Sequence, residues 1–198
     1  MDPQTLTMQA VAQQLGVDRK TLHYHVSDRE GLLELMALDA LNADAGPGDL
    51  AASGDWRAVT RAVAHHMRNS LVRAGELVEY VRFPAASGLA IFAPVERCVE
   101  ALLVAGFDED QAARAVAFMA EFVFTSARDA IMIRRHGVHP QLSEISRVMQ
   151  EADENEYGLL RRLSARSFQS GEAQFDFDLT VFVAGLDHLL AAKSSPGD

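Results

Sequence analysis

Two short helical segments separated by a tight turn open the chain and restrict its possible folds most strongly. Residues 7–15 carry apolar side chains at the spacing of one helix face, namely Met8, Val11, Ala12 and Leu15. Gly16 suits the turn, because glycine adopts positive φ at a helix end without steric cost. Asp18 is a good N-cap for a second helix over residues 19–25. This order predicts a helix-turn-helix, a module whose second helix enters the major groove of DNA.

A third helix is expected to follow directly. Ser27 and Glu30 have the spacing of a capping box, in which each side chain bonds the other residue's backbone amide. The helix after them is apolar over more than one face, which indicates burial on more than one side. Residues 44–54 then contain two acids, three glycines and a proline. We therefore expect a head over residues 1–44 and a body over residues 45–198 that binds a ligand and dimerises.

The body has the pattern of a series of helices, and the chain contains no convincing alternating strand pattern. The predicted fold class is all-α. The expected body helices cover about residues 56–74, 76–83, 94–105, 109–135, 142–152 and 175–192. The long helix near 109–135 has two apolar stripes, so we expect both sides to be buried. The last helix is too apolar to lie free, and with the long helix it is expected to form a homodimer interface near 109–135 and 177–192.

Composition excludes several classes of protein. The net charge of −10 argues against a chain whose whole surface binds nucleic acid, although it leaves a local basic patch possible. Cys98 is the only cysteine, which excludes an internal disulfide and a thiolate metal cage. No apolar run approaches the roughly 20 residues that span a bilayer, and no leader segment is recognised. We expect a cytoplasmic protein without membrane contact.

Several short groups of residues, spread over most of the chain, have a pattern typical of a known family. They are Leu6-Thr7-Met8, Val11-Ala12, Leu15-Gly16-Val17, Thr21-Leu22, His25-Val26, Arg29, Leu32-Leu33, Asp55-Trp56-Arg57, Ala105-Gly106-Phe107 and residues 182–190. With these groups the chain resembles the TetR family of bacterial transcriptional regulators, and in particular the subgroup similar to the tetracycline repressor. The resemblance implies an all-helical homodimer that acts as a repressor. It also implies a small-molecule effector that changes the spacing of two DNA-reading heads.

The resemblance assigns DNA contacts to the second helix and the start of the third. The side chains are Arg19, Lys20, Thr21, His23, Tyr24, His25 and Arg29. Arg29 stands where the family commonly has a phosphate-binding lysine. Two recognition helices related by a dimer axis read half-sites about one DNA turn apart, so the expected partner is a palindromic operator.

The head also departs from the family pattern. Residues 1–44 hold three basic and seven acidic residues. Only residues 1–6 precede the motif, so the head is expected to lack the family's usual first helix. His23 replaces a usual tyrosine, and Gln9 replaces a frequently basic residue. Because DNA affinity depends on neutralised phosphates, these departures leave an alternative open. The head is then vestigial, and the body binds or converts a small molecule.

A pocket in the body is the second candidate site. Aromatic and apolar side chains with a few polar groups are typical of ligand sites. The candidates are His66, Met67, Ser70, Tyr80, Phe83, Met119, Phe122 and Ser126. In the enzymatic alternative, His66 or Tyr80 would act as an acid or base.

Metal, cofactor and nucleophile sites are not expected. Adjacent helix residues point about 100° apart, so His65 and His66 do not form a metal pair. His136 and His139 fall in a loop and are expected to be surface histidines, although their spacing leaves a loose metal site open. Cys98 is expected to be an inert buried thiol. Glu121 is a candidate acid only if it is buried. We expect no catalytic residue, metal or cofactor.

Overall fold

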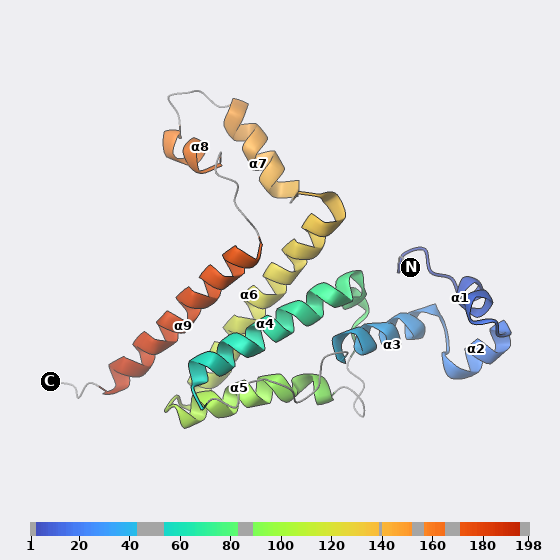
Figure 1. The fold of residues 1–198 in the computed structure, drawn as a ribbon, viewed down its shortest axis with the longest axis horizontal. Helices are drawn as coiled ribbons and strands as arrows, with labels where there is room; N and C mark the ends of the chain where they lie inside the picture. Colours follow the sequence, from blue (N-terminus) through green and yellow to red (C-terminus); the bar gives the residue numbers. More distant parts are fainter. Residues whose placement is uncertain are drawn as a thin grey trace.

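The computed structural model describes residues 3–42, 54–82, 89–138, 140–151, 157–164 and 171–194, and within these ranges it contains helices and no strand. The prediction of an all-α fold is confirmed. A small head, a helical body and a projecting arm can be distinguished (Figure 1). No helix in the described ranges is long and apolar enough to cross a membrane.

The head contains α1 (Met8–Leu15), α2 (Arg19–His25) and α3 (Arg29–Asn42). The predicted turn is confirmed, because Gly16 ends α1 in the left-handed conformation with φ of 67°. Asp18 caps α2 as predicted, and its carboxylate accepts from the Lys20 amide at 2.7 Å. A buried cluster of Met8, Ala12, Leu22 and Val26 joins the two helices. Helix-turn-helix geometry therefore follows from one glycine, one cap and four apolar side chains.

The cap of α3 differs from the prediction. Because α3 begins at Arg29, the residue at its N-cap position is Asp28 and not Ser27. The Asp28 carboxylate accepts from the Gly31 amide at 2.8 Å. The predicted capping box of Ser27 with Glu30 is therefore wrong, since it was placed one residue too early.

The body is built on α4 (Trp56–Ala74), α5 (Ala93–Val104), α6 (Glu109–His136) and α9 (Glu172–Ser194). Helices α4 and α6 run in the same direction. The Trp56 and Phe107 rings meet at 5.4 Å near their starts, and Arg68 Nε donates to Ser126 Oγ at 2.8 Å further along. Helix α9 returns beside them in the opposite direction (Figure 1). The fully buried side chains between these helices include Val63, Met119, Val123, Phe175 and Leu179, and their burial is the main source of stability.

Two short 3₁₀ helices complete the body, η1 (Gly75–Tyr80) and η2 (Leu89–Phe92). The sequence predicted a short helix over about residues 76–83, and the structure has a 3₁₀ helix over Gly75–Tyr80. Gly75 ends α4 as expected, with φ of 59°. Phe83, one of the predicted pocket residues, lies outside the described residues.

Polar side chains link α4 to α9 along one edge. Arg57 Nε donates to Asp187 Oδ2 at 3.0 Å, and His65 Nε2 lies 3.2 Å from Asp176 Oδ1. These groups are partly exposed, so each pair contributes little to stability. Their spacing of two helical turns on α4 nevertheless keeps the two helices in a fixed register.

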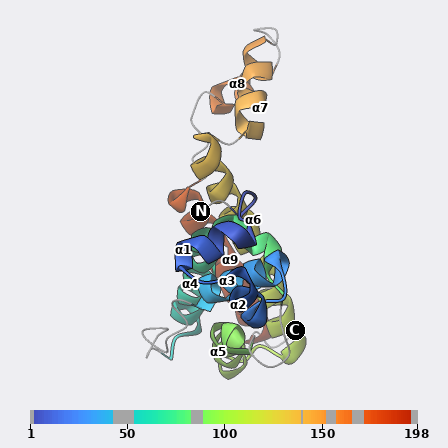
Figure 2. The ribbon, with the colours of Figure 1, turned by 90° about the vertical axis from the view of Figure 1, so that its right-hand side faces the viewer.

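The arm consists of α7 (Pro140–Glu151) and α8 (Gly158–Ser164). It extends from the end of α6, and its direction differs from that of the head (Figures 1 and 2). The sequence predicted α7 but not α8, which is only two turns long. Apolar side chains of the arm are exposed in the single chain, namely Ile145, Val148, Leu159, Leu160 and Leu163.

Asp108 joins the start of α6 to the end of α9. Its carboxylate accepts from the Gln111 amide at 2.8 Å and from Lys193 Nζ at 2.7 Å. The Lys193 ammonium and the Gln111 amide hold the pKa of the Asp108 carboxyl below its usual value. Because the folded-state pKa is lowered, this stabilisation is present above the unfolded-state pKa and is lost as the pH falls through the folded-state pKa.

We predict that Asp108→Ala lowers the melting temperature at neutral pH, because α6 loses its cap and α9 loses its ion pair. The difference from the wild type should shrink once the pH falls below the pKa of Asp108. Thermal unfolding followed by circular dichroism measures the melting temperatures of the wild type and the variant at each pH. Asp110→Ala is the matched control, since within the described part of the chain Asp110 bonds only Arg114, one turn away on the same helix. An equal loss in the two variants at neutral pH would contradict the assignment.

Candidate functional site

The outer face of α2 is the first candidate site. All six side chains predicted on this helix to contact DNA are exposed, namely Arg19, Lys20, Thr21, His23, Tyr24 and His25. Leu22 is buried and holds the helix against α1. Tyr24 has 87% of its surface exposed. The arrangement leaves one side of α2 available to a duplex groove.

His23 links both ends of α2. Arg19 Nε donates to His23 Nε2 at 3.3 Å, while His23 Nδ1 lies 3.0 Å from the Ser27 carbonyl oxygen. A carbonyl oxygen only accepts, so Nδ1 carries the hydrogen and Nε2 is the acceptor. The neutral ring therefore ties Arg19 to the turn before α3.

Arg29 has partners that the sequence did not predict. Its Nε donates to the Leu6 carbonyl at 2.8 Å, and Nη2 donates to the carbonyls of Pro3 at 2.6 Å and Gln4 at 3.4 Å. The guanidinium thus fastens the segment before α1 to the first turn of α3. Its predicted contact with a phosphate stays a prediction.

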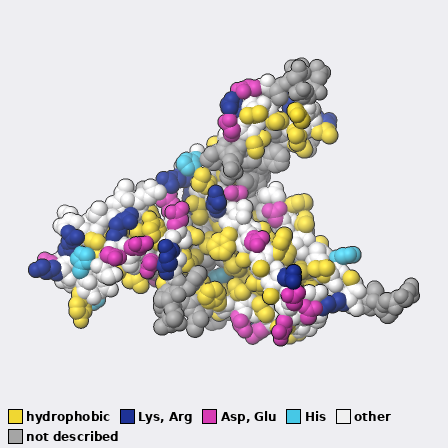
Figure 3. Space-filling model, turned by 180° about the vertical axis from the view of Figure 1, so that it is seen from behind, with side chains coloured by type: hydrophobic (Ala, Val, Ile, Leu, Met, Phe, Trp, Pro, Cys, Tyr) yellow, Lys and Arg dark blue, Asp and Glu magenta, His cyan; other side chains and the backbone are white. Residues whose placement is uncertain are grey.

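Acidic side chains lie among the basic ones on the head. Asp18 and Asp28 each cap a helix beside the outer face of α2, so part of the negative charge has a structural use. Figure 3 shows Lys and Arg side chains next to Asp and Glu side chains over the head, at the left of the view. The potential of this surface is therefore mixed, and only Arg19 and Lys20 give α2 a permanent positive charge.

A cavity of about 420 Å³ is the second candidate site. Helix α4 contributes His66, Met67 and Ser70 to its wall, and α6 contributes Val116, Ala120 and Phe124. The remaining wall comes from α5, η1, η2 and the end of α3, where Leu41 lines the space. None of the described side chains that line this cavity is charged. Its size and apolar lining are those of a small-molecule site.

The structure separates the predicted pocket residues. His66, Met67 and Ser70 line the cavity. Met119 is fully buried in the core, and Tyr80 lies in η1 and is not among the lining side chains. Phe122 and Ser126 line a smaller groove between α6 and the start of α9, where Ser126 accepts the bond from Arg68.

Several lining residues were missed by the sequence reasoning. On α6 they lie beside the stripe that holds the predicted residues Met119, Phe122 and Ser126, because neighbouring helix positions point about 100° apart. Val116 and Phe124 belonged to the other apolar stripe of that helix and were available as a signal. Leu41, Val78 and Ile91 reach the cavity from three separate segments, and no local pattern indicates this.

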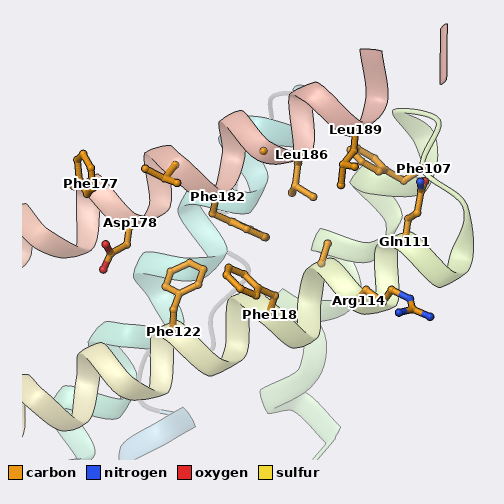
Figure 4. Close-up of a pocket in the computed structure, with 13 residues that line it drawn as sticks. Phe107, Gln111, Arg114, Phe118, Phe122, Phe177, Asp178, Phe182, Leu186 and Leu189 are labelled. Atoms are coloured by element: carbon orange, nitrogen blue, oxygen red, sulfur yellow. The ribbon is translucent and has the colours of Figure 1, made fainter. Parts of the chain in front are cut away.

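A groove of about 650 Å³ between α6 and α9 forms a third feature, shown in Figure 4. The rings of Phe118 and Phe182 stack with centroids 5.5 Å apart, and Phe122 meets Phe182 at 5.4 Å. Phe118, Phe177 and Val181 each expose more than half of their surface. An exposed apolar patch of this kind is typical of a protein–protein contact. One predicted apolar stripe of α6 is only partly buried in the single chain, since Ala127 is buried whereas Ala113, Ala117 and Phe124 are exposed.

The other chemical candidates have structural explanations. Burial raises the pKa of the Cys98 thiol, which lies 3.7 Å from the Thr60 hydroxyl. Glu121 is exposed, and His65 pairs with Asp176. His136 belongs to the last turn of α6, whereas His139 lies outside the described residues. The described part of the chain holds no group of three potential metal ligands.

Comparisons with known proteins agree with this architecture. Residues 49–190 match the family model of the tetracyclin repressor-like C-terminal domain. A possible TetR family transcriptional regulator from Streptomyces coelicolor A3(2) is similar, with 23% identity and a TM-score of 0.73 over 94% of this chain and 91% of that chain. The S. coelicolor TetR family protein ActR, in complex with actinorhodin, has 19% identity and a TM-score of 0.69 over 94% and 89% of the two chains. Mycobacterium smegmatis BioQ has 22% identity and a TM-score of 0.57 over 91% and 86%.

At these identities the solved structures support the fold, and the family model supports the family. The family model spans most of the chain, and the described head carries the helix-turn-helix. This chain therefore belongs to the TetR family of transcriptional regulators.

Proposed function

We propose that this protein is a homodimeric repressor that binds a palindromic operator through α2 and releases it when a small molecule fills the cavity. The observation that carries the proposal is the position of α3. Leu41, near its end, lines the cavity, whereas Arg29, at its start, fastens the head. ActR, a similar protein, has been crystallised with actinorhodin, which agrees with a ligand role for the body.

Helix α3 is a suitable mechanical link. It contains 14 residues and is therefore about 21 Å long. Leu32 packs against the head cluster, and Leu33, Ala37 and Leu38 are buried. A ligand that displaces Leu41 would tilt a stiff helix and move α2 with it. Such a ligand shifts the population only if it binds the released form more tightly.

The groove between α6 and α9 supports dimerisation with a second copy. Two antiparallel helices with an exposed apolar face can pair with the same two helices of another subunit around a two-fold axis. The aromatic side chains of the groove supply the apolar centre that such interfaces use. This arrangement would bury Phe118, Phe177 and Val181 in a four-helix contact.

The low positive charge of the head has a consequence for DNA affinity. A dimer presents four permanent cations on its two recognition helices, from Arg19 and Lys20 of each copy. If these neutralise four phosphates, log K falls with log salt with a slope of roughly −3.6. Most of the discrimination between sequences would then come from base contacts by neutral side chains such as Tyr24.

Selection of bound duplexes from a random pool at low salt tests the proposal. We predict enrichment of a palindrome with half-sites about one helical turn apart. Lys20→Ala should reduce the salt slope by about 1.8, because a dimer loses two phosphate contacts. Arg128→Ala is the control, since it removes an exposed cation from α6, outside the head. Failure to enrich any duplex, or an unchanged slope in Lys20→Ala, would contradict the proposal.

The proposed dimer has its own test. Val181→Glu places a charge in the groove, so we predict a monomer in sedimentation equilibrium and retained helicity in circular dichroism. Val104→Glu makes the same chemical change at a side chain of α5 that is 86% exposed and outside the groove, and it should remain dimeric. A monomeric wild type, or a dimeric Val181→Glu variant, would exclude this interface.

A further inference from the structure

We infer that the cavity takes an uncharged, mainly apolar molecule with one hydroxyl or carbonyl group, which His66 and Ser70 bind. The inference rests on the proposed function only in treating the cavity as the effector site. The chemistry of the ligand follows from the cavity wall itself.

The wall first excludes charged ligands. The described lining consists of apolar side chains apart from His66 and Ser70, and it contains no Asp, Glu, Lys or Arg. An ion that enters such a space loses its water and meets no opposite charge on a lining side chain, since Arg73, which bonds Ser70, does not itself line the cavity. Carboxylates, phosphate esters and ammonium compounds are therefore poor ligands for this site.

The two polar groups lie together on one side of the cavity. His66 and Ser70 are four residues apart on α4, which places them one helical turn from each other on the same face. They can therefore contact a single polar group at one edge of the ligand. The rest of the ligand would lie against Met67, Val116 and Phe124.

The hydrogen bonds that His66 and Ser70 can still form indicate which polar group the ligand carries. Ser70 Oγ accepts from Arg73 Nη2 at 3.1 Å, so the Ser70 hydroxyl still has its own hydrogen to donate. Among the described residues His66 has no hydrogen bond or ion pair, in contrast to His65, which pairs with Asp176. A neutral imidazole adds one donor and one acceptor. A ligand hydroxyl can accept from Ser70 and donate to His66, and a carbonyl can accept from both.

Aromatic side chains favour a ring-shaped ligand. Phe92 and Phe124 both line the cavity, and they remain 46% and 50% exposed. Partly exposed rings beside an apolar space gain contact area when a flat apolar molecule binds against them. The predicted ligand is therefore a neutral aromatic or fused-ring compound with a polar edge.

Four naphthalene probes that differ only in their polar group test the inference on the full chain by calorimetry. They are 2-naphthol, naphthalene, the anion 2-naphthoate and the cation of 2-(aminomethyl)naphthalene. We expect 2-naphthol to bind at least about tenfold more tightly than either ion, since a desolvated charge finds no partner. Equal or tighter binding of an ion, or no binding of 2-naphthol, would overturn the inference.

Single substitutions in the cavity wall test which side chains contact the probe. His66→Phe and Ser70→Ala should each weaken 2-naphthol by about five- to tenfold, the loss of one buried hydrogen bond, and leave naphthalene unchanged. Ala120→Leu should weaken both neutral probes by filling the cavity. Ala113→Leu, at an exposed site of the same helix, should weaken neither. Unchanged binding of 2-naphthol in both polar variants would also overturn the inference.

Failure of the ligand class and failure of the proposed function give different results in these experiments. If 2-naphthol binds as described but leaves the affinity for the selected duplex unchanged, the ligand class stands and the regulatory role of the cavity fails. If an ion binds in the cavity and releases DNA, the regulatory role stands and the ligand class fails.

Discussion

Burial of one helix in two separate cores is the constraint on which the arrangement of this protein depends. Leu32 near the start of α3 contacts the apolar cluster of the head, and Leu41 near its end belongs to the core of the body. The helix also packs against α4 and η1. The head therefore has no orientation of its own, because the body sets the direction of α3 and α3 carries α2. Any change at the cavity end of α3 has a direct physical route to the outer face of α2.

Helix α6 likewise borders three regions of the body with different parts of its surface. Met119 and Val123 fill the core, Val116 and Ala120 line the cavity, and Phe118 lies in the groove with α9. Because one helix borders all three regions, a ligand in the cavity lies one helix diameter from the proposed dimer contact. In the proposed function, this position lets the body connect ligand binding both to the head and to the distance between two heads.

Local signals made much of the head predictable. A few neighbouring residues are enough to predict that Gly16 forms the turn and that Asp18 caps α2, and both predictions are confirmed. The long α6 was predictable because acids begin it and arginines end it. The Asp28 cap was missed because two neighbouring residues, Ser27 and Asp28, are both good caps. The true start of the helix decided between them.

The cavity wall was only partly predictable. His66, Met67 and Ser70 share one helix face and were found by spacing, whereas Leu41 and Ile91 come from segments whose meeting depends on tertiary packing. Arg29 illustrates the same limit, because its bonds to the carbonyls of residues 3–6 depend on how the first segment folds back. Periodicity assigns a side chain to a face, and packing decides what that face meets.

Hydrogen–deuterium exchange with and without bound 2-naphthol tests the link through α3 most directly. The exchange rates of backbone amides along α3 and α2 are compared at saturating probe. We predict that changes in protection begin around Leu41 and continue through Leu33 to Arg29 and into α2, because a stiff helix transmits the displacement. Changes confined to the cavity wall, with unaltered exchange in the first half of α3 and in α2, would contradict it.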